Sequence, residues 1–270
     1  MRLSLLAGAA LLALFATAPD PARAAEGVSY PDWSGQWVRI GGSQFDPARA
    51  PARGQEAPLT EEYRSRFEAL LRKPPADGVD NSPTALCTPP GMPRAMIAEL
   101  PMEILIRPGT VYVMLSYLGG FRHIFTDGRS WPAEIEPGFD GTSIGRWQGT
   151  ELLVETRGLN GPRSFDASGL PLHDDNETLV TERIFLDPAD PDMLHDEITT
   201  IDHALTRPWQ VTRSYRRVRD AAWPEHVCAE EHQRIAIGGE IYTIGSAGRL
   251  EPMRAGQPAP DLRYFGEAKR

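Results

Sequence analysis

The segment from Met102 to Val218 is a succession of short stretches in which apolar and polar residues alternate, separated by turns rich in proline, glycine and aspartate. This alternation has the two-residue period of a β-strand, and no part of the segment has a helical pattern long enough for the crossovers of a parallel sheet. We therefore predict an all-β fold of about nine or ten consecutive antiparallel strands, an up-and-down meander. Such a sheet usually closes into a barrel, because closure removes its unpaired edges.

The turns and strands of this meander can be placed from the residues. We predict hairpins about Pro108-Gly109, Asp127-Gly128 and Gln148-Gly149, because glycine in these pairs favours tight turns between alternating stretches. Three further strands are expected in residues 177–187, 192–202 and 208–218.

The one segment with clear helical periodicity is LTEEYRSRFEALLRK, residues 59–73. Thr60 suits the N-cap, and apolar residues such as Tyr63 and Phe67 fall on one face of the predicted helix. We expect this helix in an insertion of the barrel, and an irregular tail over residues 246–270.

The N-terminus has the three parts of a secretory signal peptide. Arg2 supplies the positive charge, residues 3–18 are apolar, and Ala22-Arg23-Ala24 places small residues at the cleavage positions. We predict cleavage after Ala24 and a single exported domain, periplasmic or secreted, over residues 25–270. No later stretch reaches the roughly 20 apolar residues of a membrane span, so we expect no membrane insertion after cleavage.

The chain is acidic, with a formal net charge of −9. Without a basic run, this charge argues against nucleic acid as a partner. No sequence feature indicates an oligomeric state.

Two cysteines, Cys87 and Cys228, lie far apart in the sequence. In an exported protein they most simply form a disulfide, while a free thiol nucleophile and a metal ligand are the alternatives. The sequence has no Cys-x-x-Cys or His-Glu-x-x-His spacing, no P-loop and no dinucleotide fingerprint. We therefore expect neither a metal nor a cofactor.

Alternation along each strand predicts which side chains face the barrel interior. The polar and aromatic side chains expected to face inward are Phe121, His123, Phe125, Glu182, Trp209, Arg213 and Tyr215. In the strand around 193–201 either face could be inward, so His195 and Glu197 are also candidate ligand contacts.

The inward set is typical of a small-molecule pocket at the mouth of a barrel. We predict His123 as the general acid or base, Glu182 as a second carboxylate, and Arg213 and Tyr215 as stabilisers of negative charge on oxygen. The expected ligand contacts are Phe121, Phe125, Trp147, His195, Glu197 and Trp209. The alternative is structural: Glu182 and Arg213 only neutralise each other, and His123 binds a backbone carbonyl.

Two resemblances add to this interpretation. The segment DWSGQW, with Gly35 and Trp37, resembles the Gly-x-Trp signature of the lipocalins. In that family the tryptophan lies at the closed barrel end beneath an arginine of the last strand. The resemblance implies a lipocalin-like barrel in which Arg213 or Arg216 has this position.

The second resemblance covers most of the mature chain. The blocks CTPPGMPRAM, RHIFTDGRSWP, GTSIGRWQGTELLVET and TRPWQVTRSYRR resemble those of a large group of exported, uncharacterised bacterial proteins. This resemblance implies export and a β-rich fold. In that group an arginine often stands at the position of His123 and a histidine at that of Thr142, so this chain departs from the pattern at both.

The leading functional hypothesis is a periplasmic barrel that binds a small, partly hydrophobic or aromatic molecule. Without a cofactor or metal motif, the expected chemistry is proton transfer by a lyase or isomerase: isomerisation, elimination, hydration or cyclisation. One alternative is a non-catalytic carrier that uses the same pocket. A second is a structural or envelope-stress protein whose barrel interior is filled by side chains.

Overall fold

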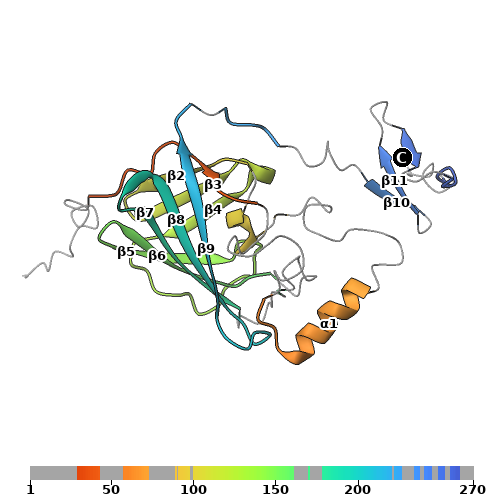
Figure 1. Cartoon of the computed structure of the whole chain (residues 1–270), viewed down its shortest axis with the longest axis horizontal. Coiled ribbons are helices and arrows are strands. Elements are labelled where there is room, and N and C mark those ends of the chain that lie inside the picture. Colours follow the sequence, from red (N-terminus) through yellow and green to blue (C-terminus); the bar gives the residue numbers. More distant parts are fainter. Residues whose placement is uncertain are drawn as a thin grey trace, which may run out of the picture. The chain divides into compact units, whose positions relative to one another are not determined.

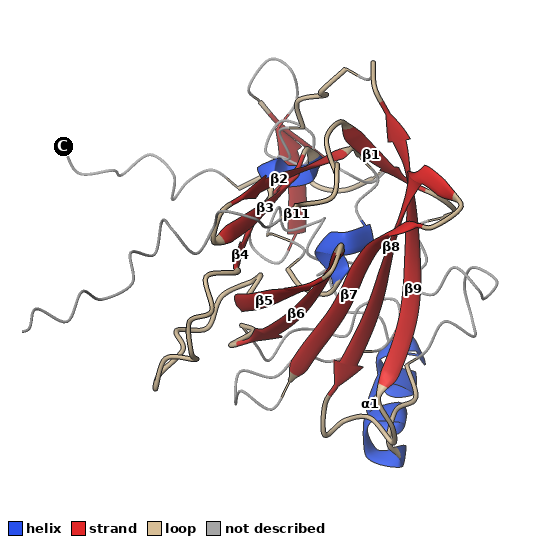
Figure 2. Cartoon of the chain, turned by 90° about the vertical axis from the view of Figure 1, so that its left-hand side faces the viewer, coloured by secondary structure: helices blue, strands red, loops and turns tan. Residues whose placement is uncertain are grey.

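A computed structural model of the chain describes residues 29–42, 57–72, 89, 91–97, 100–160, 170, 178–220, 222–226, 234–237, 240–244, 249–252 and 256–261. Its main feature is a closed β-barrel whose nine strands, β1 to β9, neighbour one another in sequence order (Figures 1 and 2). The prediction of an all-β barrel is confirmed.

The barrel strands are β1 (Gln36–Arg39), β2 (Met102–Arg107), β3 (Thr110–Leu115), β4 (Phe121–Phe125), β5 (Thr142–Gln148), β6 (Glu151–Arg157), β7 (Leu179–Asp187), β8 (Asp190–Ile201) and β9 (Trp209–Val218). Strand β9 pairs with β1 and closes the barrel, with Trp37 opposite Arg217. The predicted hairpins about Pro108-Gly109 and Gln148-Gly149 are confirmed as the β2–β3 and β5–β6 connections.

The predicted hairpin about Asp127-Gly128 is wrong, and so is the expectation that all neighbouring strands are antiparallel. Strand β4 ends at Phe125, residues 126–141 leave the sheet, and β5 returns parallel to β4. Asp127 stabilises this departure locally: its Oδ1 accepts the backbone N–H of Arg129 at 3.2 Å and its Oδ2 lies 2.6 Å from Arg129 Nη2. The turn therefore satisfies its polar groups without a second strand.

The barrel interior contains the inward side chains of alternate strand residues. Its buried apolar members come from every barrel strand except β5, whose buried residues are Ser143 and Gly145. They include Trp37, Met102, Ile104, Val111, Val113, Ile124, Leu152, Val154, Val180, Ile184, Leu194, Ile198, Trp209 and Val211.

The predicted helix is present as α1 (Glu61–Arg72), confirmed to within two residues. The segment before it is anchored on the β8–β9 connection, where Leu59 pairs with Leu205 and the backbone N–H of Thr60 donates to the carbonyl of Ala204 at 2.8 Å. Phe67, on the predicted apolar face, is buried. Two short 3₁₀ helices, η2 (Arg94–Ile97) and η3 (Tyr117–Gly119), flank β2 and β3.

A separate antiparallel sheet follows the barrel strands in the sequence. It consists of β10 (Arg234–Ile237), β11 (Glu240–Ile244) and β12 (Leu250–Pro252). Strand β12 lies inside the segment that was predicted to be irregular. Its three residues are too short for an alternating pattern to be visible in the sequence.

The signal peptide and both cysteines, Cys87 and Cys228, lie outside the described residues, so cleavage and the disulfide stay predictions. Among the helices that the structure describes, none has the length and apolar character needed to cross a bilayer.

Candidate functional site

Six polar side chains meet inside the barrel, one from each of the strands β4 to β9. We call them the charged centre. Alternation directs each of them inward, and each is at most 3% exposed. The members are Arg122, Ser143, Thr156, Glu182, Asp196 and Arg213.

Arg122 and Glu182 form the best-defined contact of the charged centre. Nη1 of Arg122 donates to Oε1 of Glu182 at 2.7 Å, and its Nη2 contacts Oε2. The same Nη2 donates to Thr156 Oγ1 at 3.1 Å and to Ser143 Oγ at 3.2 Å, and these hydroxyls lie 2.8 Å apart. Two charges removed from water need such partners, so this network accounts for the burial of both.

Asp196 differs from Glu182 because neither of its carboxyl oxygens accepts a hydrogen bond from a donor among the described residues. Burial, and after it the negative charge of Glu182, raise the pKa of Asp196 well above its usual value, although Arg122 and Arg213 oppose the shift. Burial therefore favours the neutral carboxylic acid form of Asp196. Two ionised carboxylates have no hydrogen-bond donor between them, so a proton on Asp196 supplies a donor toward Glu182.

The predicted pairing of Glu182 with Arg213 is wrong, because Arg122 is the hydrogen-bond partner of Glu182. Arg213 instead lies directly opposite Asp196 in the β8–β9 register. Its Nη2 donates to the carbonyl of Gly42 at 3.4 Å. Arg213 faces inward as predicted. Its predicted partner was wrong because alternation assigned the wrong face of β4 to the interior, and Arg122 of that strand binds Glu182.

Tyr215 lies inward as predicted, and its hydroxyl donates to the backbone carbonyl of Met96 at 2.5 Å. Burial, and after it the charge of Asp196, raise the pKa of Tyr215 well above its usual value, so the phenol stays protonated. Tyr215 therefore acts here as a donor to η2.

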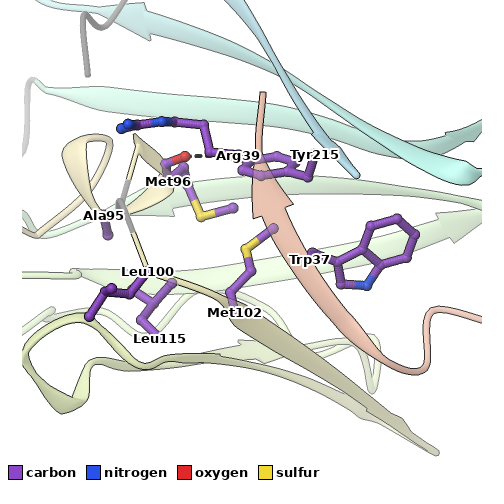
Figure 3. Close-up of a pocket in the computed structure, with 8 residues that line it drawn as sticks. All are labelled: Trp37, Arg39, Ala95, Met96, Leu100, Met102, Leu115 and Tyr215. Carbon is purple, nitrogen blue, oxygen red and sulfur yellow. Dashed lines mark hydrogen bonds between the residues drawn. The ribbon is translucent and has the colours of Figure 1, made fainter. Parts of the chain in front are cut away.

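Tyr215 also lines a narrow pocket beside η2 (Figure 3). The pocket does not admit a water molecule in this conformation. Met96 connects it to the charged centre, because the Met96 sulfur lies 3.8 Å from Nη1 of Arg122. The lining residues are Trp37, Arg39, Ala95, Met96, Leu100, Met102, Leu115 and Tyr215.

The predicted orientation of β4 is wrong. Arg122 and Ile124 are buried inside the barrel, whereas His123 lies on the outer face between the rings of Tyr112 and Phe125, at centroid distances of 4.7 and 4.0 Å. Partial burial, and after it the charge of Arg129, lower the pKa of His123. The structure therefore does not bring His123 to Glu182, Arg213 or Tyr215.

The predicted ligand contacts separate in the same way. Phe121 is 55% exposed, and Phe125 shares its outer face. His195 and Glu197 also lie outside, because Asp196 and Ile198 are the buried residues of β8.

The two tryptophans predicted to line the interior do face inward. Trp209 is buried, and the ring of Trp147 packs against that of Trp33 at 5.3 Å.

Sequence reasoning missed four members of the charged centre: Arg122, Ser143, Thr156 and Asp196. Ser143 and Thr156 were given no role, and Asp196 belonged to one of the two faces left open for its strand. Arg122 had no signal of its own, since apolar residues occupy both faces of FRHIF.

Strand β1 also carries the arrangement that the lipocalin resemblance implies, with a different arginine. The Arg217 guanidinium lies 4.5 Å from the centre of the Trp37 ring. It also donates to the backbone carbonyls of Ser34, Asp32 and Pro191 at 2.6–2.9 Å. The assignment to Arg213 or Arg216 was therefore wrong: Arg216 faces outward, and Arg217 is the inward residue opposite Trp37.

No protein-family model matches the chain, and no curated protein matches its sequence. Within the described ranges, no three histidine, cysteine, aspartate or glutamate side chains are grouped as a metal site.

Proposed function

We propose that the barrel binds a small, partly hydrophobic or aromatic molecule in the periplasm and catalyses cofactor-independent proton transfer, with Asp196 as the acid. The observation that carries this proposal is the buried Asp196 carboxyl, whose pKa is raised by burial and whose oxygens accept no hydrogen bond from a donor among the described residues. A pKa raised by burial beside a second carboxylate is characteristic of general acids in active sites.

The surroundings of Asp196 fit this role. When the acid gives its proton to a substrate oxygen or carbon, a negative charge remains on Asp196. Arg213, opposite it in the sheet, and Arg122 attract that charge, and both already lower the pKa of Asp196. Glu182 forms a bidentate pair with Arg122 and is the second carboxyl group of the site.

The entrance is the pocket beside η2. Its lining is mostly apolar, and Met96 touches both the pocket and Arg122. Because the pocket admits no water as it stands, binding requires the Met96 and Met102 side chains to move. Methionine suits such a movement, since its side chain is unbranched and adapts to irregular space.

A second candidate function is the structural barrel, and the closed pocket is the observation that favours it. In that case the charged centre only links six strands. The carrier hypothesis uses the same pocket without proton transfer.

Proton exchange separates these functions without knowledge of the natural reaction. Acetophenone and phenylacetone would be incubated with the protein in D₂O, and loss of their α-proton signals followed by NMR. An enzyme should accelerate exchange over buffer, and D196N should lower the acceleration by about 10²-fold, the contribution of a general acid or base. H123Q, altered on the outer face, should match the wild type.

The other outcomes assign the alternatives. Ligand-induced shifts in the protein spectrum without exchange would support the carrier. Neither shifts nor exchange would support the structural barrel, and full exchange by D196N would contradict the role of Asp196.

A further inference from the structure

A second polar cluster lies on the outer face of the barrel wall, formed by three residues that the proposed function does not use. His195 on β8 lies directly opposite Ser214 on β9. Nδ1 of His195 is 2.9 Å from Ser214 Oγ, and its Nε2 is 3.0 Å from Oδ2 of Asp187 at the end of β7. A serine, a histidine and a carboxylate are thus connected in sequence, each within hydrogen-bond distance of the next.

The order of the contacts fixes the protons. A carboxylate only accepts hydrogen bonds, so the Asp187 contact places the imidazole proton on Nε2. Nδ1 then carries the lone pair and accepts the hydroxyl proton of Ser214. This is the arrangement by which a histidine removes the proton of a serine nucleophile.

The carboxylate is itself held in place. Oδ1 of Asp187 accepts the backbone N–H of Ala189 at 2.8 Å, which leaves Oδ2 for the histidine. The hydrogen bond from His195, and after it the backbone N–H of Ala189, lower the pKa of Asp187, so this carboxyl is ionised near pH 7.

The remaining groups lie on regular strands. The Ser214 carbonyl accepts the backbone N–H of Ile40 at 2.8 Å, and the Phe185 ring packs against His195 at 5.3 Å. The side chain of His195 is 20% exposed and that of Asp187 34%, so a small molecule can reach the cluster from solvent. Sites built on strands keep their geometry better than sites on loops.

We propose that Ser214, His195 and Asp187 form an acyl-transfer site that hydrolyses small carboxylic esters. Ser214 Oγ attacks the ester carbonyl carbon while its proton moves to His195 Nδ1. The bond from that carbon to the alkoxy oxygen then breaks, and the alcohol leaves with the proton from Nδ1. Water attacks the acyl-serine by the same route, giving the carboxylic acid and restoring Ser214.

Positive charge for the transient oxyanion is available on the same face. Arg216 lies two residues after Ser214, so both side chains point outward. Its Nη1 is held by Asp190 Oδ2 at 2.6 Å. Arg216 is therefore the candidate oxyanion stabiliser of this site.

The test uses the purified full chain with two probes, a fluorophosphonate that labels activated serines and p-nitrophenyl acetate. Peptide mass spectrometry of the labelled wild type should locate the adduct on Ser214. S214A and H195Q should each lower kcat/KM for p-nitrophenyl acetate by about 10²-fold or more. S34A is the matched control, because the exposed Ser34 hydroxyl bonds directly to the Asp32 carboxylate without a histidine between them.

Labelling of the wild type decides the proposal even if a variant fails to fold. An adduct on Ser214 supports it, and no adduct, or an adduct on another residue, overturns it. A wild-type rate retained by S214A also overturns it.

Discussion

Arg122 and Glu182 are 60 residues apart in the sequence, yet Nη1 of the arginine donates to Oε1 of the glutamate at 2.7 Å inside the barrel. They come from β4 and β7, which are separated in the sheet by β5 and β6, so the contact crosses the interior. Ser143 and Thr156, from the two intervening strands, complete the coordination of the guanidinium. Because Arg122 must reach Glu182, the face of β4 that points inward is determined by a residue of β7.

Removal of one partner should be more damaging than removal of both. R122M leaves Glu182 buried without its cation, and we expect the free energy of unfolding to fall by about 3–5 kcal/mol. The double variant R122M/E182M leaves no unpaired charge of this pair and should lie closer to the wild type. Urea unfolding measures both, and a double variant less stable than R122M would contradict the pairing.

Asp196 should make the stability of the protein fall as the pH rises. Its pKa is raised in the folded state, so the stability it contributes is fully present below the unfolded pKa of about 4 and is lost as the pH rises toward the folded pKa. D196N cannot ionise. Its advantage over the wild type should therefore grow above pH 4, by up to about 1.4 kcal/mol per pH unit. Unfolding free energies between pH 4 and 8 test this, and parallel profiles for the two proteins would refute it.

Arg217 should contribute to stability through its backbone contacts at the barrel end. R217M leaves the carbonyls of Asp32, Ser34 and Pro191 without this donor, and we expect a loss of about 3 kcal/mol in urea unfolding. R216M, on the exposed face of the same strand, is the matched control and should stay close to the wild type. Equal losses in the two variants would show that Arg217 does not close this end.

Gly141 and Gly149 have the same φ of +63° but different surroundings. A Cβ at Gly149 meets no atom within 4 Å, so G149A should lose only about 1–2 kcal/mol from the left-handed backbone. A Cβ at Gly141 would lie 2.5 Å from the carbonyl oxygen of Arg157, where β5 begins beside the end of β6. We expect G141A to lose a further 1–3 kcal/mol or so from overpacking. Thermal unfolding compares the two variants. Equal losses would mean that the backbone around Gly141 has room for a Cβ, contrary to the close approach of the Arg157 carbonyl.

Local pattern alone predicted much of this fold. The faces of β7 and β9, the hairpins β2–β3 and β5–β6, and helix α1 follow from alternation, glycine-containing turns and helical periodicity. Each of these signals acts between residues close in sequence, so the chain carries them without tertiary context. Glu182, Arg213 and Tyr215 were placed inside the barrel for the same reason.

Only the tertiary structure decided the rest of the candidate site. Alternation divides a strand into two faces, but it identifies the inner one only when that face is clearly more apolar. In FRHIF both faces carry apolar residues, so the buried carboxylate of Glu182 on a distant strand determines that Arg122, and not His123, lies inside. Arg217 is inward for an equivalent reason, since a buried charge is stable only where partners from other segments meet it.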